Sequence, residues 1–410
     1  MISYESFTLD NGLKVIVHPN YDTAIVTLNI MYDVGARDEE ESKTGFAHLF
    51  EHLMFGGSIN IPEFDTVLQE AGAENNAFTS NDITNYYIQI TKENLETAFW
   101  AESDRMLSLS FDPKVLEVQR KVVIEEFKQR YLNQPYGDVW LLLRELAYTT
   151  HPYKWATIGK EISHIEEATM EDVKAFFTKH YLPNNAVLVV GGPVELAEIK
   201  TLSEKWFAPI PKGEKTKRNL AKEPKQTQKR TLTHQADVPV NAIFKAFHMC
   251  NKLHKDYYAS DLLSDLLGRD KTAILYKKLV EEQNLFSNIN AFVLGSFDEG
   301  LWVVSGYLNE GITFEEAEKA IDNIIYNFEE SITDKDIEKV KNQALSTVLY
   351  GQEEVMERCV SLAYSSILGD TELANQEIEK IESVTKSDIL TVAKKILQEE
   401  NASVLYYVKK

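Results

Sequence analysis

Residues 45–55 read GFAHLFEHLMF, and two histidines and one glutamate are the only polar side chains among them. On a helix, His48 and His52 lie four residues apart and Glu51 lies three residues after His48, so the three side chains share one face. Burying three polar groups in so apolar a stretch is costly unless a partner satisfies them. A metal cation is the partner that this set of side chains predicts.

The composition is that of a globular protein. The chain has 410 residues, of which 44% are hydrophobic and 26% charged, enough for two or three domains with their own cores. The net charge is 43 − 64 = −21. This charge argues against nucleic acid and anionic membranes as partners and suits cationic or neutral ones. An acidic surface that only keeps the protein in solution explains the charge equally well.

Three observations predict a cytoplasmic protein. Cys250 and Cys359 lie far apart and in no metal-binding spacing, so we expect no disulfide framework and a reducing compartment. The first seven residues, MISYESF, lack the basic and apolar regions of a signal peptide. No apolar run approaches the length of a transmembrane helix.

Residues 211–230 have the composition of a linker. They contain eight Lys or Arg and two Asp or Glu, a local charge of 8 − 2 = +6, with two prolines and few large apolar residues. The absence of aromatic residues among the basic ones argues against a nucleic-acid patch. We expect this basic linker to lie against acidic surface on one or both domains.

The pattern of strands and helices before the linker begins again after it. The closing segment of the first half, YLPNNAVL at 181–188, resembles LQEENASVL at 397–405. We therefore predict an α+β fold of two tandem homologous domains, each a mainly antiparallel sheet packed with helices. The expected boundaries are a metal-binding domain at 1–210 that contains the residues 45–55, the linker at 211–230 and a domain without metal at 231–410.

A catalytic zinc site usually has three protein ligands, so a third ligand is expected from another helix. The predicted helix at 113–131 offers Glu125 and Glu126. At 100° per residue, Glu126 lies at the centre of a stripe with Val115, Gln119, Val122 and Val123. Glu125 falls to one side among lysines and is expected in solvent, so Glu126 is the predicted ligand.

These residues resemble the pitrilysin/insulinase-type inverzincins, the family of zinc metallopeptidases that includes the mitochondrial processing peptidase subunits. The His-x-x-Glu-His motif at 48–52 matches the zinc helix of that family, and Glu126, 74 residues after His52, matches its distal glutamate. The resemblance covers essentially the whole chain. It is closest to the zinc-binding subunits of the processing-peptidase branch.

The resemblance implies one zinc ion bound by His48, His52 and Glu126, with Glu51 as general base. It implies that Asn76, Ala77, Phe78 and Thr79 bind the peptide substrate as an added edge strand. Family members often carry a second glutamate seven residues before the distal ligand, where this chain has Gln119, so altered zinc affinity is expected. The implied architecture is half of a clamshell whose chamber favours unfolded peptides.

The second half departs from the family pattern. Val280 and Ser287 stand where family members commonly have an Arg and a Tyr that bind the substrate carbonyl, and Ile274 replaces a further Arg. We therefore predict a homologous partner subunit that supplies the Arg/Tyr pair, with a homodimer as the alternative.

The alternative function is a non-catalytic subunit that binds peptides or builds an assembly around a structural zinc. No serine-hydrolase or nucleotide-binding motif is present.

Overall fold

The computed structural model describes residues 1–215 and 218–410, which form two compact units. Neither unit is a continuous segment. The first contains Met1–Lys128, Trp155–Leu220 and Leu349–Gln376, and the second contains Gln129–Lys154, Ala221–Val348 and Glu377–Lys410. In the described ranges, no helix is long and apolar enough to cross a membrane.

The first unit is built on a six-stranded sheet with the order β1-β2-β6-β3-β5-β4. All neighbouring strands are antiparallel except β2 and β6. The strands are β1 (Glu5–Thr8), β2 (Lys14–Pro19), β3 (Ile25–Tyr32), β4 (Glu74–Thr79), β5 (Thr84–Thr91) and β6 (Ala186–Gly192).

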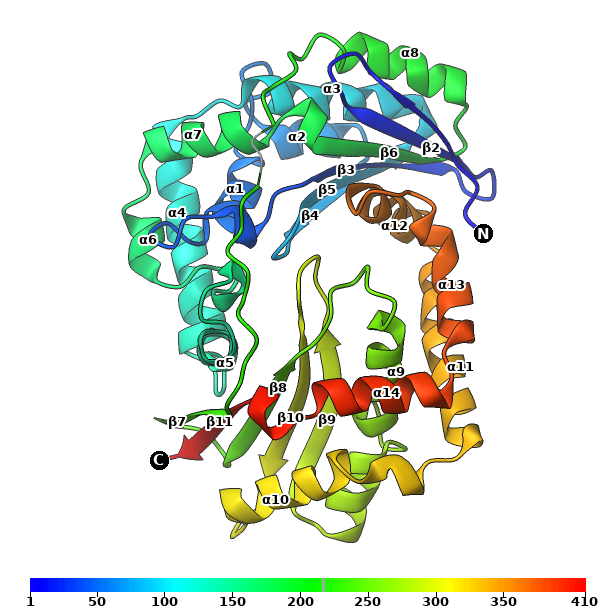
Figure 1. Ribbon diagram of the computed structural model, residues 1–410. Coiled ribbons are helices and arrows are strands. Elements are labelled where there is room, and N and C mark those ends of the chain that lie inside the picture. The colour runs from blue at the N-terminus through cyan, green and yellow to red at the C-terminus, as the bar shows by residue number, and fades with distance from the viewer. Residues whose placement is uncertain (216–217) are drawn as a thin grey trace. The chain divides into compact units, whose positions relative to one another are not determined.

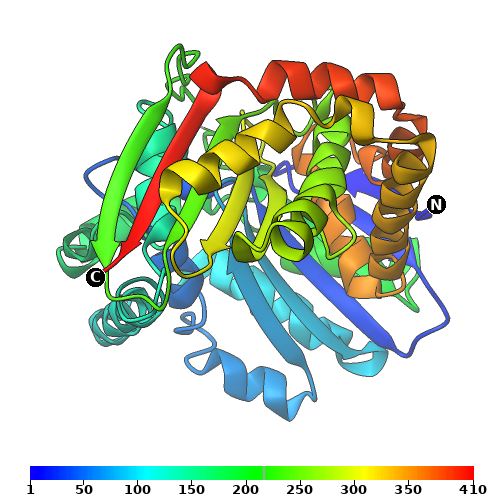
Figure 2. The ribbon, with the colours of Figure 1, turned by 90° about the horizontal axis from the view of Figure 1, so that it is seen from below.

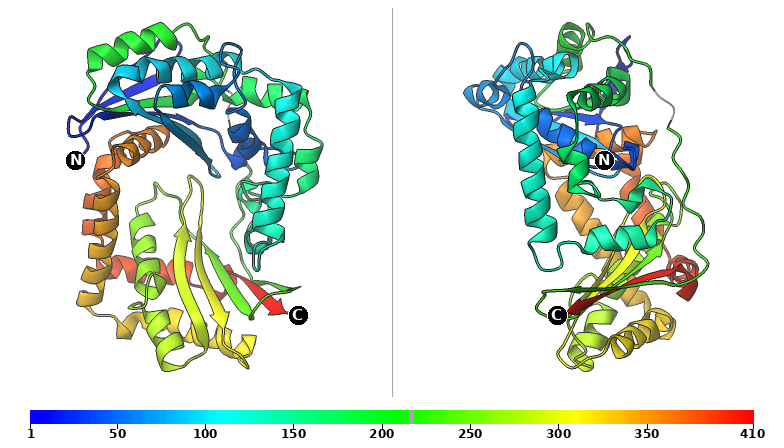
Figure 3. Two further views of the ribbon diagram at one scale, coloured as in Figure 1. Left: turned by 180° about the vertical axis from the view of Figure 1, so that it is seen from behind. Right: turned by 90° about the vertical axis from the view of Figure 1, so that its left-hand side faces the viewer.

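Helices cover both faces of this sheet. α3 and α8 pack on one face, and α12 packs on the other against β3 and β6 (Figures 1 and 3). The helices of the unit are α1 (Phe46–Leu53), α2 (Phe64–Glu70), α3 (Leu95–Ser108), α4 (Pro113–Phe127), α6 (Ile162–Glu166), α7 (Met170–His180), α8 (Leu196–Trp206) and α12 (Val355–Ile367).

The second unit contains a five-stranded sheet with the order β7-β11-β8-β10-β9. Its strands are β7 (Arg230–Ala236), β8 (Ala242–His248), β9 (Phe286–Leu294), β10 (Leu301–Leu308) and β11 (Ala402–Lys409). Figure 2 shows the red β11 beside the green β7, and these two strands are parallel. Its helices are α5 (Val139–Ala147), α9 (Tyr257–Gly268), α10 (Phe314–Ile325) and α14 (Lys386–Ile396), whereas α11 (Asp334–Gly351) and α13 (Leu373–Ser383) each cross a boundary between the units.

Alternation along β8 divides the core of the second unit between the two faces of its sheet. Ile243 and Phe247 belong to the core that includes residues of α9, α10 and α14, whereas Phe244 and Ala246 belong to the core that includes residues of α5. Successive side chains of a strand point to opposite faces, so β8 is apolar on both sides. This arrangement confirms the predicted α+β class.

The two sheets share one topology. Without β1, the first sheet has the order β2-β6-β3-β5-β4, which matches β7-β11-β8-β10-β9 strand for strand, including the single parallel pair. One side chain repeats as well. The Asn185 amide donates to the carbonyls of Asp33 (3.1 Å) and His180 (2.9 Å), and the Asn401 amide donates to those of His248 (3.0 Å) and Ile396 (2.9 Å). Both features support the duplication that the closing segments predict.

The compact units nevertheless differ from the predicted segments 1–210 and 231–410. The segment 129–154, with α5, belongs to the second unit, and 349–376, with α12, belongs to the first. Each half of the sequence thus provides a helix for the sheet of the other half, which hydrophobic periodicity cannot reveal. The sequence analysis also missed α8, α12, α13 and β7. From hydrophobic patterning a single helix is expected at 164–180, whereas the structure has α6 and α7 there, because the Thr169–Asp172 capping box begins a second helix.

The two ends of the basic linker are bound to their own units. In the first unit, the Arg218 guanidinium donates to the Asp38 carboxylate (2.6 Å), and Lys215 pairs with Asp33 (3.2 Å). These ion pairs confirm the expected contact between the basic linker and acidic surface. In the second unit, the Glu223 carboxylate accepts hydrogen bonds from the N–H groups of residues 149–151. Burial opposes the charge, but these bonds prevail and lower the pKa of Glu223 to about 2.

Candidate metal centre

The helix α1 begins at a position that only glycine fits. Gly45 has φ +84°, and a Cβ there would lie 2.6 Å from the Ile158 carbonyl oxygen. No side chain at this position caps the helix. The Glu39 carboxylate does so instead, accepting hydrogen bonds from the N–H groups of Gly45 (2.9 Å) and Ala47 (2.8 Å). These contacts fix the start of the helix that carries the His-x-x-Glu-His motif.

Glu39 is a buried carboxyl group in an apolar setting. Burial raises the pKa of Glu39 to about 8, and the two backbone hydrogen bonds act in the opposite direction. Its oxygens satisfy N–H groups that the first turn of the helix leaves without an intrahelical partner. Glu39 was missed from the sequence, where it looked like part of a polar loop. One signal could have pointed to such a residue: the motif helix begins at a glycine, which has no side chain to cap it, so a cap from elsewhere in the chain was to be expected.

Glu126 is positioned by α4. Asp112 caps this helix by accepting the Lys114 N–H (2.8 Å), and a proline follows at the first turn. The Glu126 side chain is 19% exposed, whereas that of Glu125 is 61% exposed and pairs with Lys128 at 2.8 Å. The position of each glutamate around the helix therefore predicted correctly that Glu126 is the less exposed of the two carboxylates. Gln119 is half-buried two turns earlier.

The structure brings the three predicted ligands together. Glu126 Oε2 lies 3.7 Å from His48 Nε2 and 3.5 Å from His52 Nε2. The ligand atoms of all three residues lie within 4.8 Å of one another. Four tetrahedral ligands at about 2.1 Å from zinc would be roughly 3.4 Å apart, so two imidazoles and a carboxylate at these separations fit a zinc ion. Throughout residues 1–215 and 218–410, no other group of His, Cys, Asp or Glu meets this criterion.

Glu51 lies on the same helix between the two histidines and contacts β4. Its Oε2 accepts a hydrogen bond from the Thr79 hydroxyl at 2.5 Å. The sequence analysis assigned Thr79 to substrate binding, whereas its side chain contacts the predicted base. The missed signal was strand alternation, which turns residues 75, 77 and 79 to one face of β4.

Thr79→Val should reduce kcat about tenfold, because a hydrogen bond to a charged group contributes roughly 1.5–3 kcal/mol and this one fixes the Glu51 carboxylate. KM should change less, because the substrate would bind through the backbone of β4. Thr79→Ser keeps the hydroxyl and should restore most of kcat. Steady-state kinetics with a fluorogenic peptide would measure both constants, and equal losses in the Val and Ser variants would contradict this role.

The strand β4 is one edge of the first sheet, since among the described strands it pairs only with β5. Asn76 and Phe78 are exposed on it, whereas Ala77 and Thr79 are half-buried. The Asn76 side-chain carbonyl accepts the Ala77 N–H at 2.8 Å, so the side chain of this strand covers one of its own edge donors. An edge strand can add a peptide strand through its backbone groups.

A buried polar and aromatic cluster lies in the core of the same unit. The Arg105 guanidinium pairs with Glu102 and lies 4.4 Å from the ring centre of Phe64 and 4.5 Å from that of Tyr86. The hydroxyls of Tyr86 and Tyr181 are 2.9 Å apart. A buried ion pair between aromatic rings has little freedom to move. This cluster gives the core of the first unit a fixed geometry.

The positions in the second unit where the family has Arg and Tyr carry other structure. Ile274 and Val280 are partly buried against the core of that unit, and Ser287 is exposed on β9, where its hydroxyl donates to the Tyr307 carbonyl at 3.2 Å. None of the three can provide the cationic and phenolic donors.

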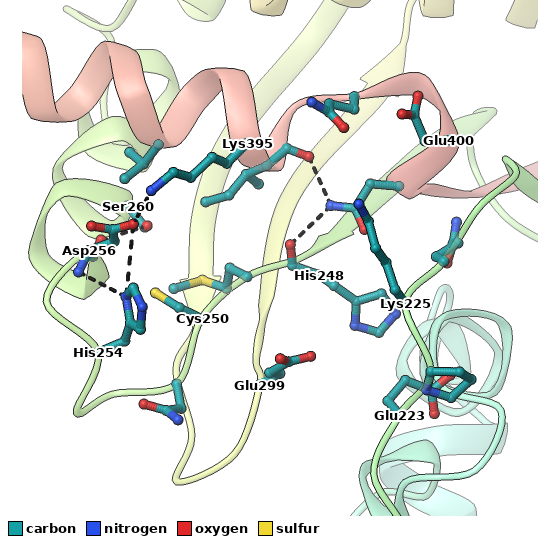
Figure 4. Close-up of a pocket in the computed structure, with 18 residues that line it drawn as sticks. Glu223, Lys225, His248, Cys250, His254, Asp256, Ser260, Glu299, Lys395 and Glu400 are labelled. Atoms are coloured by element: carbon teal, nitrogen blue, oxygen red, sulfur yellow. Dashed lines mark hydrogen bonds and ion pairs between the residues drawn. The ribbon is translucent and has the colours of Figure 1, made fainter.

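The second unit also contains a pocket of about 500 Å³ (Figure 4). Its lining includes Cys250, His254, Asp256 and Lys395, and Lys395 pairs with Asp256 at 2.6 Å. Burial raises the pKa of the Cys250 thiol, which disfavours a reactive thiolate. The charges of this pocket are of both signs, so it points to no single ligand chemistry. The candidate chemistry therefore rests with the three-residue cluster of the first unit.

Comparison with known proteins identifies the family of the chain. Residues 14–159 match the model of the insulinase family of peptidases, family M16, and residues 167–344 match that of the peptidase M16 inactive domain. The zinc protease PqqE of Helicobacter pylori is 32% identical over 345 residues, covering 82% of this chain and 78% of that relative. The chain belongs to peptidase family M16. The metal cluster lies within the matched insulinase segment.

Two further proteins are similar over nearly the whole chain. The mitochondrial-processing peptidase subunit beta of Saccharomyces cerevisiae is 23% identical, covering 97% of this chain and 89% of the relative. The crystal structure of a protease from Helicobacter pylori has a TM-score of 0.93 at 28% identity, covering 99% of this chain and 100% of that one. The predicted family and its α+β fold are thus confirmed.

Proposed function

We propose that the protein is a zinc-dependent endopeptidase that hydrolyses unfolded peptides. The observation that carries this proposal is the convergence of His48, His52 and Glu126, with Glu51 beside them on α1. Three protein ligands leave a fourth position for water or substrate, whereas a structural zinc site is normally closed by four. The inverted motif would make the protein an inverzincin with one zinc per chain.

A zinc ion held by these residues would activate water near neutral pH and polarise the peptide carbonyl. Glu51 accepts the proton of the attacking water and then delivers it to the leaving amine. The Thr79 hydroxyl donates to Glu51 Oε2 and so holds the carboxylate of the proposed base in place. Gln119 has no charge to strengthen the ligands, so we expect weaker zinc binding than a glutamate there would give.

The substrate backbone is proposed to pair with β4 at Asn76–Thr79. Asn76 first releases the Ala77 N–H, which then becomes available to a carbonyl of the peptide. Backbone pairing explains affinity for extended chains of many sequences. The two unpaired cysteines suit a reducing compartment, and we place the protein in the cytoplasm on that basis.

Metal removal tests this function directly. The purified chain should hold about one zinc ion, cleave an unstructured peptide, lose cleavage after treatment with a chelator, and recover it when zinc is restored. Metal analysis and mass spectrometry of the products measure both properties. Cleavage that persists in metal-free protein would exclude this mechanism.

We further propose that a homologous partner subunit supplies the Arg/Tyr pair, because Val280 and Ser287 cannot. Removing an oxyanion donor usually costs about 10²–10³ in rate, so the isolated chain should be slow and co-expression with an M16 protein that carries the pair should raise kcat by a similar factor. Light scattering of the purified mixture reports the complex. If no complex forms and the rate is unchanged, the chain acts alone or as a homodimer.

A further inference from the structure

The outer edge of the second sheet is open where the first sheet carries an additional strand. In the first sheet, β1 pairs antiparallel with the outer side of β2. The match between the two sheets makes β7 the counterpart of β2, and among the described strands β7 pairs only with β11. Figure 2 shows the green β7 outermost in its sheet. Alternate backbone N–H and C=O groups of β7 therefore point outward, and no described strand pairs with them.

The residues just before β7 do not supply a counterpart of β1, because they are bound elsewhere in the second unit. Gln226 is buried, its amide donates to the Ala402 carbonyl (2.8 Å), and it accepts the Ser403 hydroxyl (3.2 Å) at the start of β11. Lys229 pairs with Glu318 of α10 at 2.7 Å. The end of the linker thus cannot also fold back along the outer edge of β7. A strand that completes this edge is therefore expected from another molecule.

β7 also lacks the features that prevent other edge strands from pairing, which are short length, lysine or proline, and an irregular register. β1 has only four residues, Asn76 covers an edge N–H of β4, and the pairing of β9 with β10 shifts register at Tyr307. By contrast, β7 has seven residues, RTLTHQA, in continuous register with β11 and without lysine or proline. The Arg230 guanidinium donates to the carbonyls of Leu146 and Ala147, so its charge does not guard the edge.

The sequence of β7 is complementary to itself in the antiparallel direction. When Thr233 lies opposite Thr233 of a copy, all seven residues pair, with Thr231 opposite Gln235 and Leu232 opposite His234. Opposed threonines are favourable, and this register places no like charges opposite each other. Thr231, Thr233 and Gln235 are exposed, whereas Leu232 packs partly against the core that includes residues of α5. The register keeps these two faces distinct across both copies.

We propose that β7 pairs with β7 of a second copy of this chain, antiparallel about a two-fold axis at Thr233. Such an interface uses the same surface of both copies and joins their second sheets into one continuous sheet. β7 belongs to the second unit and the metal cluster to the first, so this inference does not depend on the proposed peptidase function. One pair of strands buries less surface than the ~1,200 Å² at which stable complexes begin, so we expect a weak dimer.

Sedimentation velocity of the full chain tests the pairing. The parent protein should shift from monomer to dimer over roughly 10–100 μM. Thr233→Lys places two ammonium groups opposite each other and should weaken dimerisation about tenfold, and Thr233→Glu should do the same with two carboxylates. An equimolar mixture of these two variants should recover the association, because position 233 then carries opposite charges on the two copies. This recovery is specific to a two-fold register centred on Thr233.

Ser6→Lys is the matched control, because Ser6 is exposed on β1, the corresponding edge strand of the first sheet. It should leave the dimer unchanged, and equal melting temperatures show that all variants fold. A parent protein that stays monomeric overturns the proposal. So does a dimer that survives Thr233→Lys, or a mixture of the two charged variants that stays monomeric. If Thr233→Lys instead disrupts only binding of an M16 partner or an extended peptide, that ligand occupies the edge and a second copy does not.

Discussion

Glu51→Gln should abolish peptide hydrolysis while zinc stays bound. A positioned general base contributes about 10²–10⁴ in rate, so kcat should fall by at least that range. The amide carbonyl of Gln can still accept the Thr79 hydroxyl, which now holds Glu51 Oε2 at 2.5 Å, so the side chain should keep its place. The loss of activity would then result from the loss of proton transfer and not from a displaced side chain at position 51. Peptide turnover and zinc per chain are the two measurements.

The pattern of results separates the two function classes. A variant that hydrolyses peptides as fast as the parent refutes the assignment of Glu51 as base. A parent chain that binds zinc and peptide but cleaves nothing, even with its partner, supports the alternative of a non-catalytic subunit with a structural metal. Glu125→Gln removes an exposed carboxylate of α4 and should leave both measurements unchanged.

Glu126→Ala should remove the zinc ion. Loss of an outer-shell partner already lowers metal affinity about 10–100-fold, and loss of a ligand should cost more. A 100-fold weaker affinity in excess zinc corresponds to about 2.7 kcal/mol less stabilisation of the folded state. We therefore expect metal-depleted protein after dialysis and a lower melting temperature in zinc-containing buffer. Metal analysis and calorimetry in the presence and absence of zinc measure the two effects.

The neighbouring carboxylate provides the control for this change. Glu125→Ala alters the same helix by the same number of atoms, but the Glu125 side chain is 61% exposed and pairs with Lys128. It should keep zinc and lose little stability, since exposed pairs contribute about 0–1 kcal/mol. If both variants lose zinc equally, the helix as a whole matters and Glu126 is no specific ligand.

Much of the fold follows from local sequence. Hydrophobic patterning predicts a strand at 186–192 and a helix at 139–147, and both elements have these bounds. The sequence Asp10-Asn11-Gly12 is typical of a hairpin turn, and it joins two antiparallel strands. The packing of helices against the sheets did not follow from local sequence. The hydrophobic periodicity of α5 and α12 does not indicate which sheet covers the apolar face of each helix, because both sheets offer an apolar surface.

The candidate site was likewise predictable only in part. His48, His52 and Glu126 could be selected because metal coordination restricts residue type, spacing and helical phase at once. Glu39 and the contact between Thr79 and Glu51 could not, since each joins elements that are brought together only by the fold. Val122 shows a partial error. The sequence analysis placed it on the stripe centred on Glu126, which was expected to face the core, yet its side chain is 44% exposed.

The reciprocal placement of α5 and α12 has a consequence for how the chain can be divided. A break in the linker separates each sheet from the helix that covers one of its faces: β3 and β6 lose α12, and β8 and β11 lose α5. In each fragment alone, the sheet face that lost its helix would be exposed to water. Two such fragments produced from separate genes would therefore have to fold on each other, as complementing halves of one protein, and each alone would aggregate.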